Sequence, residues 1–249
     1  MSRCFAVVHE ADADFQTATQ LADRVLTESI AWLDKDQLAS QRTWVAEADP
    51  GRRFTWKGIK RLAQDAGIRV HGHFDGEPGL ADAAAARRAI HYLRVTLPQL
   101  IALVLIRDQD DQPERLRGLE QARQEQHSGL PIVIGMAIVN RECWVLSGFD
   151  PENSSEASGV EAVRQLLGFN PQTHSHRLSS SDKSPGSSKR VLRELSRDDH
   201  DRERRCWCTT ALTVLTERGR ENGLAAYLGE VRDRLAPLIG SPPQEGKPR

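Results

Sequence analysis

The stretch Leu100-Ile101-Ala102-Leu103-Val104-Leu105-Ile106 is the most apolar run of the chain, and Arg107-Asp108-Gln109-Asp110-Asp111 follows it directly. A short, continuous apolar run of this kind is typical of a strand buried on both faces, as in a parallel sheet. We therefore predict that this run is the central strand of the fold and that acidic side chains follow its carboxyl end.

Apolar segments on either side of this run predict an α/β domain. Strands are predicted at residues 4–9, 68–74 and 131–139, and helices at 13–30, 80–97 and 113–128. Residues 75–79 are expected to form a loop, and residues 142–146 either continue the last strand or begin a helix. The alternation of strands and helices predicts a Rossmann-like, mostly parallel sheet flanked by helices.

The remaining segments are less regular. Between residues 31 and 65, Trp32, Trp44 and Trp56 are expected to anchor short helices and loops over the core. No long apolar strand follows Asp150, so residues 1–150 are predicted to be the catalytic core and residues 151–239 a helical extension. The Ser-rich segment 179–188 is predicted to be a mobile loop, and residues 240–249 a disordered tail.

The overall composition is that of an ordinary globular protein, with 39% hydrophobic and 28% charged residues. The formal net charge of −1 gives no bulk basicity, although a local basic groove would still allow nucleic-acid binding. The four cysteines form no zinc or disulfide pattern, and no signal-type or membrane-spanning apolar segment is present. We therefore expect a cytoplasmic protein with reduced thiols and no membrane association.

Two predicted strands end in carboxylates, since Glu10 follows the first and Asp108 and Asp110 follow the central one. Ligands of parallel α/β sheets lie at the carboxyl ends of strands, and Mg²⁺ prefers carboxylate oxygens. In extended backbone, Asp108 and Asp110 would point the same way. The alternative is that the acidic run 108–111 only ends a strand and caps the next helix.

Three segments resemble motifs of the Toprim family. The first is Val7-Val8-His9-Glu10-Ala11-Asp12-Ala13-Asp14-Phe15, which is similar to a strand followed by Glu-Gly-x-x-Asp. The second is residues 103–110, similar to a strand followed by Asp-x-Asp. The third is Glu142-Cys143-Trp144-Val145-Leu146, which resembles the Glu-x-Trp-Leu-Leu element of OLD-like and RloB-like Toprim proteins. The sequence departs from the first motif at Ala11, where glycine is usual, and at His9, where an apolar residue is commoner.

The resemblance implies a nuclease that cleaves phosphodiester bonds of DNA or RNA with Mg²⁺ or Mn²⁺. Asp108 and Asp110 would be metal ligands, Glu10 a further ligand or a general acid/base, and Glu142 a ligand of a second metal. Asp14 is expected to orient the turn after Glu10 and Asp111 to be solvated or to cap a helix. The resemblance also implies a role in antiphage defence beside a separate ABC-type or AAA-type ATPase, because this chain has no phosphate-binding loop of its own.

Several basic residues are candidates for contacts with phosphate. Lys183, Lys189 and Arg190 border the Ser-rich segment, and Lys189 is the candidate for stabilising charge that develops on phosphorus. The alternative is a solvated charged loop. Arg107, next to the acidic run, would either balance its charge or contact phosphate.

Other motifs have competing interpretations. The pairs His71/His73 and His174/His176 would present two imidazoles for zinc only if they met further ligands. Cys206 and Cys208 are interpreted as structural thiols, and the five tryptophans as packing residues rather than base-stacking platforms.

Two other functions compete with the nuclease. One is a non-catalytic binding or regulatory subunit. The departures from the Toprim motif at His9 and Ala11 favour it. The other is a primase-like or topoisomerase-like activity, which the chain has no room and no zinc module to support. A homo-oligomer is compatible with all three.

Overall fold

A parallel β-sheet forms the centre of the computed structural model, which describes residues 3–126 and 129–240. The strand order is β2-β1-β6-β7, and the short β3 also pairs with β1. All these pairings are parallel, and the predicted apolar run lies in the interior of the sheet. The mostly parallel α/β fold is therefore confirmed. The strands are β1 (Arg3–His9), β2 (Arg42–Trp44), β3 (Phe54–Thr55), β6 (Leu100–Asp108) and β7 (Ile132–Ala137).

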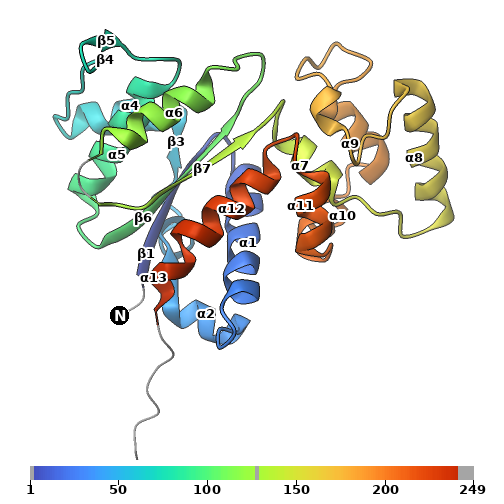
Figure 1. Ribbon diagram of the computed structural model, residues 1–249, viewed down its shortest axis with the longest axis horizontal. Coiled ribbons are helices and arrows are strands. Elements are labelled where there is room, and N and C mark those ends of the chain that lie inside the picture. Colours follow the sequence, from blue (N-terminus) through green and yellow to red (C-terminus); the bar gives the residue numbers. More distant parts are fainter. Residues whose placement is uncertain (1–2, 127–128, 241–249) are drawn as a thin grey trace, which may run out of the picture.

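Helices cover both faces of this sheet (Figure 1). One face packs against α4 (Trp56–Asp65), α5 (Ala83–Thr96) and α6 (Arg115–Gln124), and the other against α1 (Asp12–Ser29) and α12 (Leu224–Arg234). Successive strand residues point to opposite faces. In β6, Leu103 and Leu105 accordingly pack with the α4–α6 layer, whereas Val104 and Ile106 pack with the α1–α12 layer.

After β7, the described part of the chain forms helices joined by loops, with one isolated bridge between Ser179 and Ser187. Residues 142–146 begin a helix rather than continue the strand, and Figure 1 shows the following helices beside the sheet before α12 returns across its face. Tyr227 of α12 stacks on Trp144 with 5.1 Å between ring centroids, and its hydroxyl donates to the Ala18 carbonyl. The helices are α7 (Arg141–Ser147), α8 (Ser154–Leu167), η1 (Ser175–Arg177), α9 (Ser188–Ser196), α10 (His200–Cys208), α11 (Leu212–Arg218) and α13 (Ala236–Ile239).

The predicted strand at residues 68–74 is wrong. Only His73–Phe74 forms a strand, β4, and it pairs antiparallel with β5 (Glu77–Pro78) in a small hairpin outside the main sheet. This segment lies on the surface, and Phe74 is its one buried residue. The guanidinium carbon of Arg87 lies 3.5 Å from the centre of the Phe74 ring. The predicted loop 75–79 therefore contains one strand of this hairpin.

The irregular region 31–65 contributes more than expected. It holds α2 (Lys35–Gln41), α3 (Val45–Ala48) and the two short strands β2 and β3, which extend the sheet on the β1 side. Trp44 and Trp56 are buried as predicted, and Trp32 packs partly buried against the core.

Two segments that were predicted to lack regular structure are the Ser-rich segment 179–188 and the tail 240–249. The Ser-rich segment closes on itself, because Ser188 donates to the carbonyl of Ser179 and Ser179 donates to that of Gly186. Of the predicted disordered tail, residues 241–249 lie outside the described residues. No helix in the described part of the chain is long and apolar enough to cross a membrane.

Candidate functional site

Glu10 and Asp108 lie at the same edge of the sheet. Asp108 is the last residue of β6, and Glu10 directly follows β1, the neighbouring strand. Both strands run in the same direction, so their carboxyl ends meet at the edge where α/β proteins bind ligands. The strand-end argument from the sequence therefore identifies two acidic residues that the fold places close together.

The strand register nevertheless turns these two side chains to different faces. Val8 is level with Leu105, so counting two residues onward brings Glu10 level with Arg107 rather than with Asp108. Neighbouring parallel strands present residues of the same level on the same face. Glu10 and Arg107 thus share the α4–α6 side, and Asp108 belongs to the α1 side.

On the α1 side, Arg141 of α7 organises the carboxylates. Its backbone N–H donates to Asp108 Oδ1 at 2.9 Å. Its guanidinium lies 3.7 Å from Asp14, 3.4 Å from Glu142 and 3.9 Å from Glu203 of α10. The Arg141 side chain is only 11% exposed, so a single buried cation faces several carboxylates.

Asp108 is electrostatically the most perturbed residue of this group. Burial, together with the charges of Asp14, Glu10, Glu142 and Asp110, raises its pKa from 3.8 to about 8. Burial also raises the pKa of Asp14, where the N–H of Ala11 and Arg141 act in the opposite direction. Near neutral pH, Asp108 is thus largely protonated, because burial and the neighbouring carboxylates disfavour its charged form.

On the other side, Arg107 and Arg115 hold the remaining acidic residues. Arg107 lies 2.9 Å from Glu10, and Arg115 lies 2.6 Å from Asp110. Asp82, at the start of α5, pairs with both arginines at 2.8 and 3.2 Å. These contacts join β6, α5 and α6 in one network of ion pairs.

The expected parallel alignment of Asp108 and Asp110 is wrong. The extended strand ends at Asp108, and Asp110 adopts a left-handed backbone with φ 48°. The two carboxylates consequently have different partners, the N–H of Arg141 for Asp108 and the guanidinium of Arg115 for Asp110. Spacing by two residues fixes a common direction only in regular strand geometry.

The capping interpretation of residues 108–111 does not hold either. Helix α6 begins after Glu114, whose side chain makes no capping hydrogen bond. Asp111 instead accepts from the Ser180 hydroxyl at 3.2 Å, which links the acidic run to the Ser-rich segment.

The turn after β1 shows how the two departures from the first motif fit. Asp14 accepts from the N–H of Ala11 at 2.7 Å, which confirms that it orients this turn. Ala11 has an ordinary extended backbone with φ −133°, so alanine causes no strain there. His9 is fully buried, donates through Nδ1 to the Ala11 carbonyl at 2.9 Å and packs against Phe15.

The donor chemistry of this edge fits a hard divalent cation, but the ligands are not gathered in advance. Within residues 3–126 and 129–240, no three His, Cys, Asp or Glu side chains converge as a metal site requires. The arginines explain why, since they hold Glu10 and Asp110 on one side and Asp14 and Glu142 on the other. Carboxylates still outnumber arginines seven to three. They are Glu10, Asp14, Asp82, Asp108, Asp110, Glu142 and Glu203, against Arg107, Arg115 and Arg141.

Lys189 lies on α9 and pairs with Asp182 at 3.8 Å, with its side chain 55% exposed. The sequence-predicted role for this lysine at phosphorus therefore has no support in its contacts. The solvated interpretation of the charged loop matches this exposure better.

The histidine and cysteine motifs form no metal cluster among the described residues. His71 faces the guanidinium of Arg87 at 3.0 Å, and the rings of His174 and His176 are 5.9 Å apart. Cys206 is buried in the core and Cys208 is partly buried, and both are free thiols, in line with a structural role.

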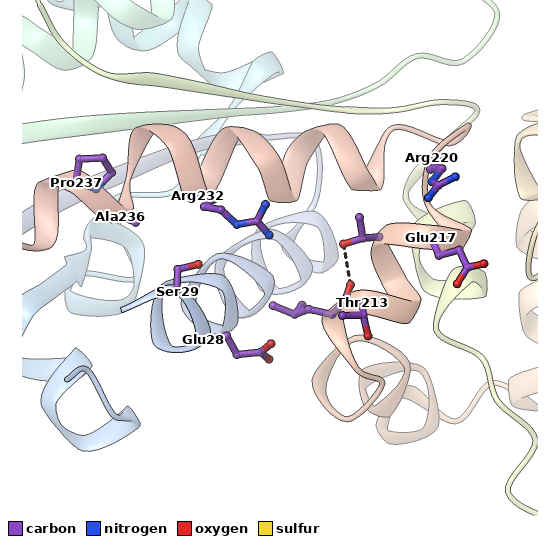
Figure 2. A pocket seen from close by; sticks show the side chains of 10 residues that line it. Glu28, Ser29, Thr213, Glu217, Arg220, Arg232, Ala236 and Pro237 are labelled. Carbon is purple, nitrogen blue, oxygen red and sulfur yellow. Dashed lines mark hydrogen bonds between the residues drawn. The ribbon is translucent and has the colours of Figure 1, made fainter. Parts of the chain in front are cut away.

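A pocket of about 870 Å³ lies away from the carboxylates. Figure 2 shows Glu28 of α1 and Arg232 of α12 on facing walls of this pocket, with Glu217 and Arg220 at one end. Its lining includes none of the predicted site residues. This pocket is therefore separate from the acidic site at the strand ends.

Sequence reasoning missed Asp82, Arg115 and Arg141. Asp82 has a left-handed backbone with φ 64°, a conformation that aspartate tolerates better than most residues, but this becomes visible only in the structure. Arg115 and Arg141 lie close in sequence to Asp110 and Glu142, but no motif marks them, because their other partners come from distant segments. No protein-family model, curated protein or solved structure matches this chain.

Proposed function

We propose that the protein is a divalent-metal-dependent nuclease that cleaves phosphodiester bonds of DNA or RNA. The observation that supports this most is the excess of carboxylates over arginines around Asp108, whose pKa is raised to about 8. Such a concentration of acidic groups at the ligand-binding edge of a parallel sheet is relieved when a cation enters. The resemblance to Toprim motifs agrees with this interpretation.

In this proposal Asp108, Asp110 and Glu142 would hold Mg²⁺ or Mn²⁺, and Glu10 would be either a further ligand or a general acid/base. The cation supplies electrostatic stabilisation of charge on the phosphodiester oxygens. Arg141 keeps Asp108 and Glu142 in place through its N–H and its guanidinium. Burial raises the pKa of Glu10, partly opposed by Arg107, so that Glu10 is suited to take up or release a proton during cleavage.

Cleavage of plasmid DNA, single-stranded DNA and tRNA with Mg²⁺ or Mn²⁺ tests the proposal. We expect metal-dependent cleavage by the wild type and its loss in the double variant Asp108→Ala, Asp110→Ala. Asp75→Ala is the matched control, because Asp75 is exposed, lies in the β4–β5 hairpin and shares the φ of 48° with Asp110. Cleavage retained by the double variant would contradict the assignment.

A second candidate is a non-catalytic binding or regulatory subunit. It is favoured by the ion pairs of Arg107 and Arg115, which neutralise Glu10 and Asp110 without any added cation. Mn²⁺ binding without cleavage of any polynucleotide would support this function over the nuclease.

The proposal includes a separate ATPase partner and a role in antiphage defence. Both follow from the family resemblance alone. Co-purification with an ATPase encoded beside this protein would support the partnership, and full activity of the solitary protein would count against it.

A further inference from the structure

Two arginines of the site share one anchor and each holds one exposed carboxylate. Arg107 donates through Nε to Asp82 at 2.8 Å, and Arg115 lies 3.2 Å from the same carboxylate. Asp82 is only 18% exposed, whereas Glu10 and Asp110 are 36% and 42% exposed. The inner partner is therefore fixed, and the outer partners face solvent.

The outer ion pairs are the exchangeable ones. Ion pairs at solvent-exposed positions contribute little to stability, because water screens them and their side chains lose freedom. The guanidinium groups themselves are well held, with side-chain exposures of 15% for Arg107 and 10% for Arg115. The indole of Trp56 lies beside Arg107 at 5.4 Å, and Arg115 also donates to the Asp108 carbonyl at 2.8 Å.

Arg115 is held on its inner side by Asp82 and by the Asp108 carbonyl, and its outer contact is the exposed Asp110. Its buried Nε lies 3.2 Å from Asp82 and makes no well-aligned hydrogen bond there, so this contact fixes the guanidinium by charge. Arginine presents several N–H donors in a rigid planar fork that matches the oxygens of a phosphate. Two such forks on a common anchor, beside the proposed metal ligands, suit a phosphodiester group.

We propose that Arg107 and Arg115, anchored on Asp82, form a phosphate-binding pair that exchanges Glu10 and Asp110 for a backbone phosphate of the nucleic-acid substrate. The inference rests on the proposed function, because Glu10 and Asp110 join Asp108 and Glu142 at the cation when the arginines turn to phosphate. In the free protein, Arg107 forms an ion pair with Glu10, and Arg115 forms one with Asp110.

Binding of a labelled single-stranded oligonucleotide, followed by fluorescence anisotropy at several salt concentrations, tests the pair. The titrations use the full chain, with Ca²⁺ to occupy oxygen ligands and with EDTA. In Ca²⁺ we expect the double variant Arg107→Gln, Arg115→Gln to bind roughly tenfold more weakly or worse. The slope of log affinity against log salt should fall by about 0.7 for each lost phosphate contact.

Two further variants keep the test decisive. Arg123→Gln is the matched control, because Arg123 also lies on α6, is partly buried and pairs with Glu230 at 2.7 Å away from the site. We expect its affinity and salt slope to equal those of the wild type. If the glutamine double variant does not fold, Arg107→Lys with Arg115→Lys retains the charges, and weaker binding by this folded variant supports the pair.

The outcomes separate the two proposals. If the wild type binds the oligonucleotide and the arginine variants bind it equally well with the same salt slope, the phosphate-binding pair is refuted and the nuclease proposal stands. If the wild type binds no polynucleotide under either condition, the proposed substrate class fails and the pair fails with it.

Discussion

Replacing Asp108 by asparagine is expected to change how the stability of the protein depends on pH. The pKa of Asp108 is about 8 in the folded protein, against 3.8 for an ordinary aspartate, chiefly because of burial. The folded state thus binds a proton that the unfolded state releases. Its contribution to stability is fully present below about pH 4 and is lost as the pH rises to about 8. Asparagine resembles the protonated form and removes this dependence.

The magnitude follows from the two pKa values. A difference between 3.8 and about 8 corresponds to roughly 6 kcal/mol, at about 1.4 kcal/mol for each pKa unit. Asp108 is not fully buried, and solvent at the rim of the site reduces this to about 2–4 kcal/mol. The asparagine also keeps a side-chain oxygen that accepts the N–H of Arg141.

Urea unfolding at about pH 5 and about pH 9 measures how the free energy of unfolding depends on pH. Urea is uncharged, so it does not screen the charges of the site. We expect Asp108→Asn to lose less stability than the wild type between the lower and the higher pH, and to be the more stable of the two at the higher pH. Asp65→Asn is the control, since Asp65 lies on α4 with its side chain 70% exposed. An equal pH dependence in wild type and Asp108→Asn would refute the reasoning, and so would a less stable variant at the higher pH.

Three further substitutions test the packing around the site, each by urea unfolding. Arg141→Met should cost about 3–5 kcal/mol, because it leaves several partly buried carboxylates without their cation, and a near-neutral result would show that they do not depend on it. Gly118→Ala should destabilise by about 1–3 kcal/mol or more, since its Cβ would lie 1.8 Å from the Ala81 carbonyl oxygen; unchanged stability would contradict this close approach. Trp56→Phe should cost about 1–2 kcal/mol by leaving the buried Ile106 carbonyl without its 2.6 Å hydrogen bond, and a stability equal to wild type would dismiss that bond.

The long apolar runs could be predicted because burial on both faces leaves a direct trace in composition. β1, β6 and β7 each contain a run of this kind. β2 and β3 have three and two residues, too few for any periodicity to be recognised. Residues 68–74 include several apolar side chains, but most of them are not buried in the structure. The inference from an apolar run to a buried strand therefore failed there.

The edge of the sheet that gathers the acidic residues could also be predicted, but not their pairing. Strand order brings Glu10 and Asp108 together, and this follows from adjacent parallel strands. The register, which sets Glu10 level with Arg107, depends on packing along the whole length of both strands. Asp82 comes from a segment that only the tertiary fold brings near. Arg141 precedes Glu142 directly, but its contacts with Asp108 and Asp14 depend on the tertiary fold, so no local pattern marks it.

Calorimetric titration with Mn²⁺ at about pH 7, in buffers of different ionisation enthalpy, tests the central claim most directly. The wild type is expected to bind the cation and to release protons as it does so, because Asp108, with a pKa of about 8, loses its proton to become a ligand. Asp108→Asn should bind more weakly and release fewer protons, whereas Asp65→Asn should behave as wild type. Absence of Mn²⁺ binding by the wild type, or identical binding by Asp108→Asn, would contradict a cation site at this edge of the sheet.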